Sequence, residues 1–295
     1  MKILVTGGTV FVSKYIASYF QNKHEVYVLN RGTKEQLPNV KLIKASREEL
    51  PSLHNYCFDA IIDVTSYTKK EMEDLLSHTN KPQVFIFISS SAVYKQSSLP
   101  LKEDSNKGWN EIWKDYGKNK LEAEEYLLSK NKEAYILRPP YLYGPMNNLY
   151  REAFVFDACV KGEEFYLPEK EFSLQFFHVD DLCKIIEMIL QGKVEEHILN
   201  IGNEEKVSLE EWIKLCYGVN NKTPKFKYVD SSIFERLYFP FYNYDYYLDI
   251  TKMKNYLPIQ ISLLSGFKDS YEWYKLNQDK VIKKDYFKFI QENLE

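Results

Sequence analysis

The fold is decided by the amino-terminal residues, which run Met1-Lys2-Ile3-Leu4-Val5-Thr6, then Gly7-Gly8-Thr9-Val10, then Phe11–Phe20. The first run is short and apolar at consecutive positions, as is typical of a strand buried on both faces. From Phe11 to Phe20 the apolar residues recur every three or four positions, which predicts an amphipathic helix. A buried strand, a glycine turn and a helix in this order predict a parallel α/β sheet.

The same alternation continues along the chain. Further short apolar runs are expected to form strands at Glu25–Leu29, Lys41–Lys44, Ala60–Val64, Val84–Ser89, Ala134–Arg138 and Ile198–Ile201. One helix, Lys69–Thr79, fits between the fourth and fifth strands. We therefore expect an α/β protein with a Rossmann-type doubly wound parallel sheet, whose ligand crevice lies at the carboxyl ends of the strands.

From about Leu142 the pattern changes to helices, proline-containing loops and aromatic clusters. We expect residues 1–142 to form the nucleotide-binding domain, with residues 173–203 returning to it. Residues 143–172 and 204–295 would form a smaller, mostly helical, substrate-binding cap. The aromatic run Tyr238–Tyr247 either lines a pocket there or fills a core.

Composition excludes several classes of protein. Charged residues make up 27% of the 295 residues and hydrophobic ones 44%, which is typical of a soluble globular protein. The net charge of −3 argues against general affinity for nucleic acid. No apolar run reaches the ~18 residues of a membrane span. The chain enters its first strand without a cleavable signal, and its four cysteines lack metal or disulfide spacing, so we expect a cytoplasmic protein without a metal site.

The glycine turn predicts a dinucleotide site. Glycines let the backbone approach a pyrophosphate, and the free amides at the helix start bind the anion. The expected contacts are Gly7, Gly8, Thr9, Phe11 and Val12. At the end of the second strand, Asn30 and Arg31 replace the acidic residue that would bind the ribose of NAD, and an arginine here favours the 2′-phosphate of NADP. A surface arginine in a turn remains the alternative.

Four motifs follow in order. Strand five runs into Phe87-Ile88-Ser89-Ser90-Ser91-Ala92-Val93-Tyr94, and Tyr116 and Lys120 come 26 and 30 residues after Ser90. Arg138–Pro145 and Phe177–Asp181 complete the set. The Tyr-x-x-x-Lys spacing alone has little weight, because both residues are abundant in this chain. Together, the motifs resemble the NAD-dependent epimerase/dehydratase family, the extended or atypical short-chain dehydrogenases/reductases.

The resemblance implies a reaction centre. It makes Tyr116 the acid/base, Lys120 the cation that lowers its pKa, and Ser90 the donor to the substrate oxygen. A free phenol has a pKa of about 10, so it needs a nearby positive charge to act as a base. The resemblance also implies further cofactor contacts at Ser46, Val64, Thr65, Ser89 and Pro139, in addition to Tyr116 and Lys120, and substrate contacts at Ser91 and Tyr141. His178 is expected at a strand-to-helix junction, without a catalytic role.

The chain also departs from the family pattern. Val10 and Ser13 stand where the second and third glycines belong, and no relay asparagine is evident between strands four and five. Leu174 replaces an arginine that contacts the diphosphate of sugar nucleotides. These departures resemble the atypical branch that includes chloroplast stem-loop RNA-binding proteins.

Two classes of function follow from these features. The first is an NAD(P)-dependent oxidoreductase or epimerase that acts on a small molecule, at a hydroxyl-bearing carbon of a sugar or sugar nucleotide. The second is a non-catalytic NAD(P)-binding sensor or an RNA-binding protein. The joint presence of Ser90, Tyr116 and Lys120 favours catalysis, since a sensor does not need all three. The oligomeric state stays open, with a homodimer among the options.

Overall fold

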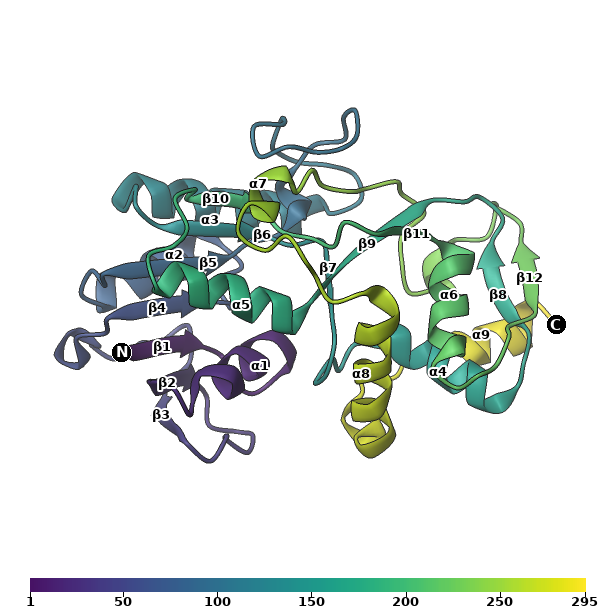
Figure 1. Ribbon diagram of the computed structural model, residues 1–295, viewed down its shortest axis with the longest axis horizontal. Helices are drawn as coiled ribbons and strands as arrows, with labels where there is room; N and C mark the ends of the chain where they lie inside the picture. The colour runs from purple at the N-terminus through teal and green to yellow at the C-terminus, as the bar shows by residue number, and fades with distance from the viewer.

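The computed structural model describes residues 1–295 and confirms the doubly wound parallel sheet (Figure 1). Seven parallel strands lie in the order β10-β6-β5-β4-β1-β2-β3. They are β1 Lys2–Thr6, β2 Glu25–Asn30, β3 Val40–Lys44, β4 Ala60–Asp63, β5 Val84–Ile88, β6 Tyr135–Arg138 and β10 Ile198–Asn200. Because the chain proceeds from β1 to β3 on one side and then to β4 on the other, a crevice opens between β1 and β4 at their carboxyl ends.

Helices cover both faces of this sheet. One face carries α1 (Phe11–Phe20) and α5 (Val179–Leu190), and the other carries α2 (Lys69–His78) and α3 (Lys114–Lys130). Each face has its own hydrophobic core. The core under α1 and α5 has 31 buried residues, and the core under α2 and α3 has 13. The buried, branched side chains of the strands pack against both helix layers, which explains why the strands are apolar at consecutive positions.

The carboxyl-terminal part adds two small sheets to its helices, on the right of Figure 1. Its strands are β7 Tyr141–Tyr143, β8 Phe165–Pro168, β9 Ser173–His178, β11 Lys206–Ser208 and β12 Phe226–Val229. Its helices are α4 Glu152–Lys161, α6 Leu209–Gly218, α8 Leu263–Leu276 and α9 Tyr286–Asn293. The short helix α7 (Thr251–Lys254) lies instead beside β10 of the large sheet. Short 3₁₀ turns occur at His54–Tyr56 (η1), Ser91–Val93 (η2), Glu235–Leu237 (η3) and Gln278–Lys280 (η4).

A third hydrophobic core of 30 buried residues holds this part together. The tyrosine-rich run contributes Tyr238, Phe239 and Phe241, and the ring of Phe241 packs edge-on against the buried Trp212. The start of the run, Tyr238–Phe241, is therefore buried in this core, whereas Tyr246 packs into the core of the large sheet and lies beside the cavity described below.

A buried polar network joins the sheet to α3. The guanidinium of Arg138, at the end of β6, donates to both carboxylate oxygens of Glu124 at 3.0 and 2.5 Å, and to the Tyr94 hydroxyl at 2.9 Å. Tyr94 donates in turn to Asn200 at the end of β10, at 2.6 Å. The network thus ties α3 to the loop after β5 and to the edge of the sheet.

No helix of the protein combines the length and the apolar character needed to cross a lipid bilayer.

Removing one partner of the buried pair tests the importance of this network. Glu124→Gln leaves the Arg138 charge without its counter-charge, so the free energy of unfolding should fall by about 3 kcal/mol or more. Urea denaturation measures the change. The control is Glu125→Gln, an exposed neighbour on the same helix, which should change stability little. Equal stability of the two variants would contradict the structural role of the pair.

Candidate active site

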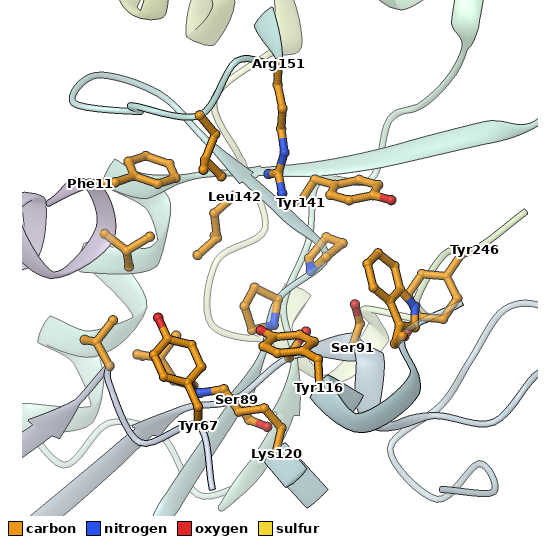
Figure 2. Close-up of a pocket in the computed structure, with 18 residues that line it drawn as sticks. Phe11, Tyr67, Ser89, Ser91, Tyr116, Lys120, Tyr141, Leu142, Arg151 and Tyr246 are labelled. Atoms are coloured by element: carbon orange, nitrogen blue, oxygen red, sulfur yellow. Dashed lines mark hydrogen bonds between the residues drawn. The ribbon is translucent and has the colours of Figure 1, made fainter. Parts of the chain in front are cut away.

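A cavity of about 300 Å³ opens at the carboxyl ends of the central strands (Figure 2). It brings together residues that are far apart in the sequence and that were predicted to act there: Phe11, Val12, Val64, Ser89, Ser90, Ser91, Tyr116, Lys120, Pro139 and Tyr141. The loops that follow β1, β4, β5 and β6 supply most of them. Parallel strands end at the same edge of the sheet, which explains why these loops meet.

A second cavity of about 410 Å³ lies beside the first and holds the other predicted cofactor contacts. These are Gly7, Thr9, Asn30, Arg31, Ser46 and Thr65. Tyr67 lines both cavities, so they are neighbours. Gly8 lines neither. With a φ of +86° it passes against β2, and a Cβ there would lie 2.4 Å from the Val28 side chain.

The turn after β1 accommodates Ser13 in place of a glycine. Its hydroxyl donates to the Val10 carbonyl at 3.0 Å. A Cβ on Gly7 would lie 2.7 Å from this same hydroxyl oxygen, so the close packing depends on Gly7 lacking a side chain. No side chain caps the start of α1. Its first amides therefore remain available to an anion such as a pyrophosphate.

Asn30 stabilises the turn itself. Its amide nitrogen donates to the Gly7 carbonyl at 2.7 Å, and its oxygen accepts from the Gly32 amide at 2.8 Å. The side chain predicted to face a ribose is thus largely engaged by the backbone, although it still lines the second cavity. Arg31, Lys34 and Arg47 also line that cavity, together with the two carboxylates of Glu48 and Glu71, so basic residues outnumber acidic ones by one.

Tyr116 lies on α3 next to the loop that carries Ser90. Gly117 makes this approach possible, because a Cβ there would lie 2.1 Å from the Ala92 carbonyl oxygen. Ser90 Oγ accepts a hydrogen bond from the Ala92 amide at 3.1 Å. This bond uses a lone pair of the hydroxyl oxygen, so its proton stays available for a ligand.

Lys120 is buried and bridges two strand ends. Its ammonium donates to the Ser66 carbonyl at 2.9 Å and to the Ile88 carbonyl at 3.0 Å, and it lies 5.0 Å from the centre of the Tyr67 ring. An ammonium has three N–H groups, so one remains for a ligand. Burial lowers the pKa of Lys120 to about 8, against the opposing influence of Asp63.

Tyr116 is held in its protonated form by its surroundings. Burial against the cavity wall raises its pKa, while the Ser90 hydroxyl and the charge of Arg151 act in the opposite direction. Lys120, which the family pattern assigns to lower this pKa, donates instead to backbone carbonyls. The structure therefore presents Tyr116 as a proton donor near neutral pH.

Eight further residues line this cavity and were not predicted as site residues. Four of them are aromatic or charged, Tyr67, Trp113, Arg151 and Tyr246, and the other four are the apolar Ile88, Pro140, Leu142 and Leu149. Tyr67 follows β4 by four residues, a position at the predicted crevice, and Tyr246 belongs to the tyrosine-rich run. The sequence positions of Tyr67 and Tyr246 could therefore have indicated that they line the cavity. Trp113 and Arg151 had no such signal, because their loops follow no periodic pattern.

His178 ends β9 and begins α5, as expected for a strand-to-helix junction. Its Nδ1 accepts a hydrogen bond from the Asp180 amide at 3.2 Å, and burial lowers its pKa, so the ring is a neutral helix cap. No three His, Cys, Asp or Glu side chains gather into a group that could hold a metal ion.

Comparison with protein families gives a match over residues 70–202, to the NAD dependent epimerase/dehydratase family. Among characterised proteins, the chain is 27% identical to a chloroplast stem-loop binding protein of 41 kDa from Arabidopsis thaliana, over 92% of this chain and 78% of that one. It is 23% identical to the UDP-N-acetyl-alpha-D-glucosaminuronate decarboxylase of Bacillus cytotoxicus, over 93% of this chain and 98% of that one.

Solved structures share the fold over almost the whole chain. The dTDP-glucose 4,6-dehydratase of Bacillus anthracis, in complex with NAD, superposes with a TM-score of 0.75 at 17% identity and covers 95% of this chain and 98% of its own. The UDP-glucuronic acid 4-epimerase of Bacillus cereus, also in complex with NAD, superposes with a TM-score of 0.74 at 18% identity. The match covers 94% of this chain and 99% of the epimerase chain.

Stability should depend on pH through Lys120. The folded protein releases this proton near pH 8, whereas an unfolded lysine keeps it to a pKa of about 10.4. Between these values the unfolded chain binds more protons, so the free energy of unfolding should rise with pH, by up to about 1.4 kcal/mol per unit. Denaturation of Lys120→Met should lack this rise, and the exposed control Lys118→Met should keep it. The same slope in all three proteins would contradict the assignment.

Proposed function

We propose that the chain is an NAD(P)-dependent enzyme acting at a hydroxyl-bearing carbon of a sugar-like substrate, and the match of residues 70–202 to the NAD dependent epimerase/dehydratase family supports this proposal. One observation carries the proposal: Ser90, Tyr116 and Lys120 line a single cavity at the carboxyl ends of the strands. The solved relatives that bind NAD have the same fold and act on nucleotide-linked sugars.

The residues present fit a dinucleotide. The open amides at the start of α1 suit its pyrophosphate, the second cavity suits the adenosine half, and the first cavity suits the nicotinamide. When bound, the nicotinamide supplies the hydride acceptor or donor. We infer a preference for NADP, because Arg31, Lys34 and Arg47 line the adenosine side and no carboxylate ends β2.

Three side chains divide the remaining work. Ser90 donates to the substrate oxygen and orients it, and Tyr116 exchanges a proton with that oxygen. When a substrate carbonyl is reduced, the protonated Tyr116 would donate its proton to the substrate oxygen. When a substrate hydroxyl is oxidised, the Tyr116 oxygen would take this proton back, and an epimerisation would use both directions in turn. The free N–H of Lys120 suits a ribose hydroxyl of the cofactor.

A sugar-sized group suits the cavity. Its volume lies at the lower end of the ~300–1,000 Å³ usual for small-molecule sites. Leu174, where sugar-nucleotide enzymes are expected to carry an arginine, is buried in β9 and offers no charge to a diphosphate. We therefore propose that recognition centres on the sugar-like part of the substrate.

One observation favours a second candidate function. The 27% identical relative that spans most of the chain is a chloroplast stem-loop binding protein. Against RNA binding stands the net charge of −3, since phosphate contacts require an excess of lysine and arginine. A non-catalytic nucleotide sensor would keep both cavities but would not depend on the Tyr116 hydroxyl.

The preference for NADP over NAD tests whether Arg31 binds the 2′-phosphate. Arg31→Ala should weaken NADP binding about tenfold and leave NAD binding nearly unchanged, because only the 2′-phosphate loses a partner. Calorimetric titration with both nucleotides measures the ratio. Glu35→Ala, an exposed neighbour on the same loop, is the control. An unchanged NADP-to-NAD ratio in Arg31→Ala would refute the preference.

Activity tests the acid/base assignment. Tyr116→Phe should reduce turnover by a factor of about 10² or more while nucleotide affinity is kept, because only the exchanged proton is lost. Tyr126→Phe is a matched control, since Tyr126 lies on the same helix and also precedes a lysine by four residues. The assay offers UDP-glucuronate, dTDP-glucose and free sugars with each nucleotide, and follows nicotinamide absorbance and sugar products by NMR. Turnover in Tyr116→Phe equal to that of the unmodified protein would refute the acid/base role of Tyr116, whereas nucleotide binding without turnover in the unmodified protein would favour the second class of function.

A further inference from the structure

Arg151 enters the reaction cavity without a partner. It precedes α4, is half-buried, and its guanidinium points into the cavity from the side opposite Lys120 (Figure 2). The guanidinium carbon lies 5.0 Å from the centre of the Tyr141 ring and 5.8 Å from that of Phe241. These rings hold the side chain in place, but they do not neutralise its charge.

Two other enclosed arginines of the chain are paired. Arg138 forms its buried ion pair with Glu124, and Arg47 lies 3.7 Å from a carboxylate oxygen of Asp63. A charge removed from water without a counter-ion is costly, so such a group usually serves a ligand. Arg151 therefore differs from them in having its guanidinium directed to open space.

A second arginine stands on the far side of the same aromatic wall. Arg236 lies 4.7 Å from the centre of the Tyr242 ring and donates to the Phe239 carbonyl at 3.2 Å. The Trp113 ring, in edge contact with both Tyr141 and Tyr242, connects the two arginines. Arg236 has no ion-pair partner either, and it contributes, after burial, to lowering the pKa of Arg151.

The neighbouring carboxylate does not cancel this charge. Glu152 follows Arg151 in the chain, but its side chain accepts a hydrogen bond from Asn147 at 2.8 Å within the protein interior. Burial raises the pKa of Glu152, which weakens it as a counter-ion. Arg151 in the cavity wall, and Arg236 behind the aromatic residues of that wall, thus have no ion-pair partner.

We propose that Arg151, with Arg236 behind it, binds an anionic group of the substrate, a carboxylate or a phosphoryl group, while Ser90 and Tyr116 hold the reacting hydroxyl. The planar guanidinium fork matches the paired oxygens of both anions. The proposal rests on the proposed function and narrows it. The substrate carries its negative charge and its reacting hydroxyl at opposite ends of the cavity, so neutral sugars are poor ligands.

Calorimetric titration of the NADP-loaded protein tests this anion site with three probes: glucuronic acid, glucose 1-phosphate and glucose. At least one anionic probe should bind more tightly than glucose. Arg151→Gln should weaken that binding about tenfold or more, the equivalent of one charged hydrogen bond, and should leave glucose and NADP affinities unchanged. Arg151→Lys should retain part of the affinity, and Lys132→Ala, an exposed charge far from the cavity, should retain all of it.

The probe that responds identifies the anion as carboxylate or phosphoryl. Equal affinity for glucose and both anionic probes would overturn the proposal, as would an equal loss for glucose in Arg151→Gln. Thermal denaturation checks that each variant is folded. Tyr116→Phe separates this inference from the proposed function, because it should lose turnover yet keep the preference for the anionic probe over glucose. Full turnover in Tyr116→Phe would refute the proposed role of Tyr116 in the reaction, but it would leave the proposed anion site at Arg151 unaffected.

Discussion

The site depends on a single buried ion pair. Arg138 and Glu124 are each about 2% exposed, and their bond holds α3 against the end of β6. Since α3 also carries Tyr116 and Lys120, the position of the reactive phenol relative to Ser90 follows from a contact two helical turns away. The Tyr94 hydroxyl extends the same network to the loop that bears Ser90. The buried ion pair therefore helps to set the distance between Tyr116 on α3 and Ser90 in the loop after β5.

Sheet topology supplies the second constraint. Strands β2 and β3 are added on one side of β1, and β4 and the later strands are added on its other side. The carboxyl ends of β1 and β4, which are parallel neighbours, open onto the same crevice. Gly7, Gly8 and Gly117 allow three close approaches of backbone that a Cβ would block. The departures from the family pattern are accommodated within this geometry. Ser13 replaces a glycine and returns a hydrogen bond to the turn, and Asn30 replaces an acid and braces it.

The large sheet was predictable from sequence because its strands are buried on both faces, so Val, Ile and Leu mark them directly. Tyr116 and Lys120 were predictable as a pair, since four residues place two side chains on one face of a helix. The hydrogen-bond partners of Lys120 were not predictable, because they are backbone carbonyls, which every residue type has. Arg151 could not be predicted either. Its direction depends on how the loop after β7 turns back towards the cavity, which no local pattern encodes. The two small sheets were missed because their strands lie outside the regular alternation of strands and helices, in a part of the chain that was predicted to be mostly helical.

Tyr67 gives the two cavities a shared wall. Its ring lines both and lies over the Lys120 ammonium, while its backbone amide is held by the Glu71 carboxylate at the start of α2. A ligand on the adenosine side and a ligand on the reaction side thus contact the same side chain. If either displaces the ring, the other meets a changed surface, and thermodynamic linkage makes that influence equal in both directions. Tyr67 is the one residue that lines both cavities, so a coupling between ligands in the two halves of the crevice would pass through its ring.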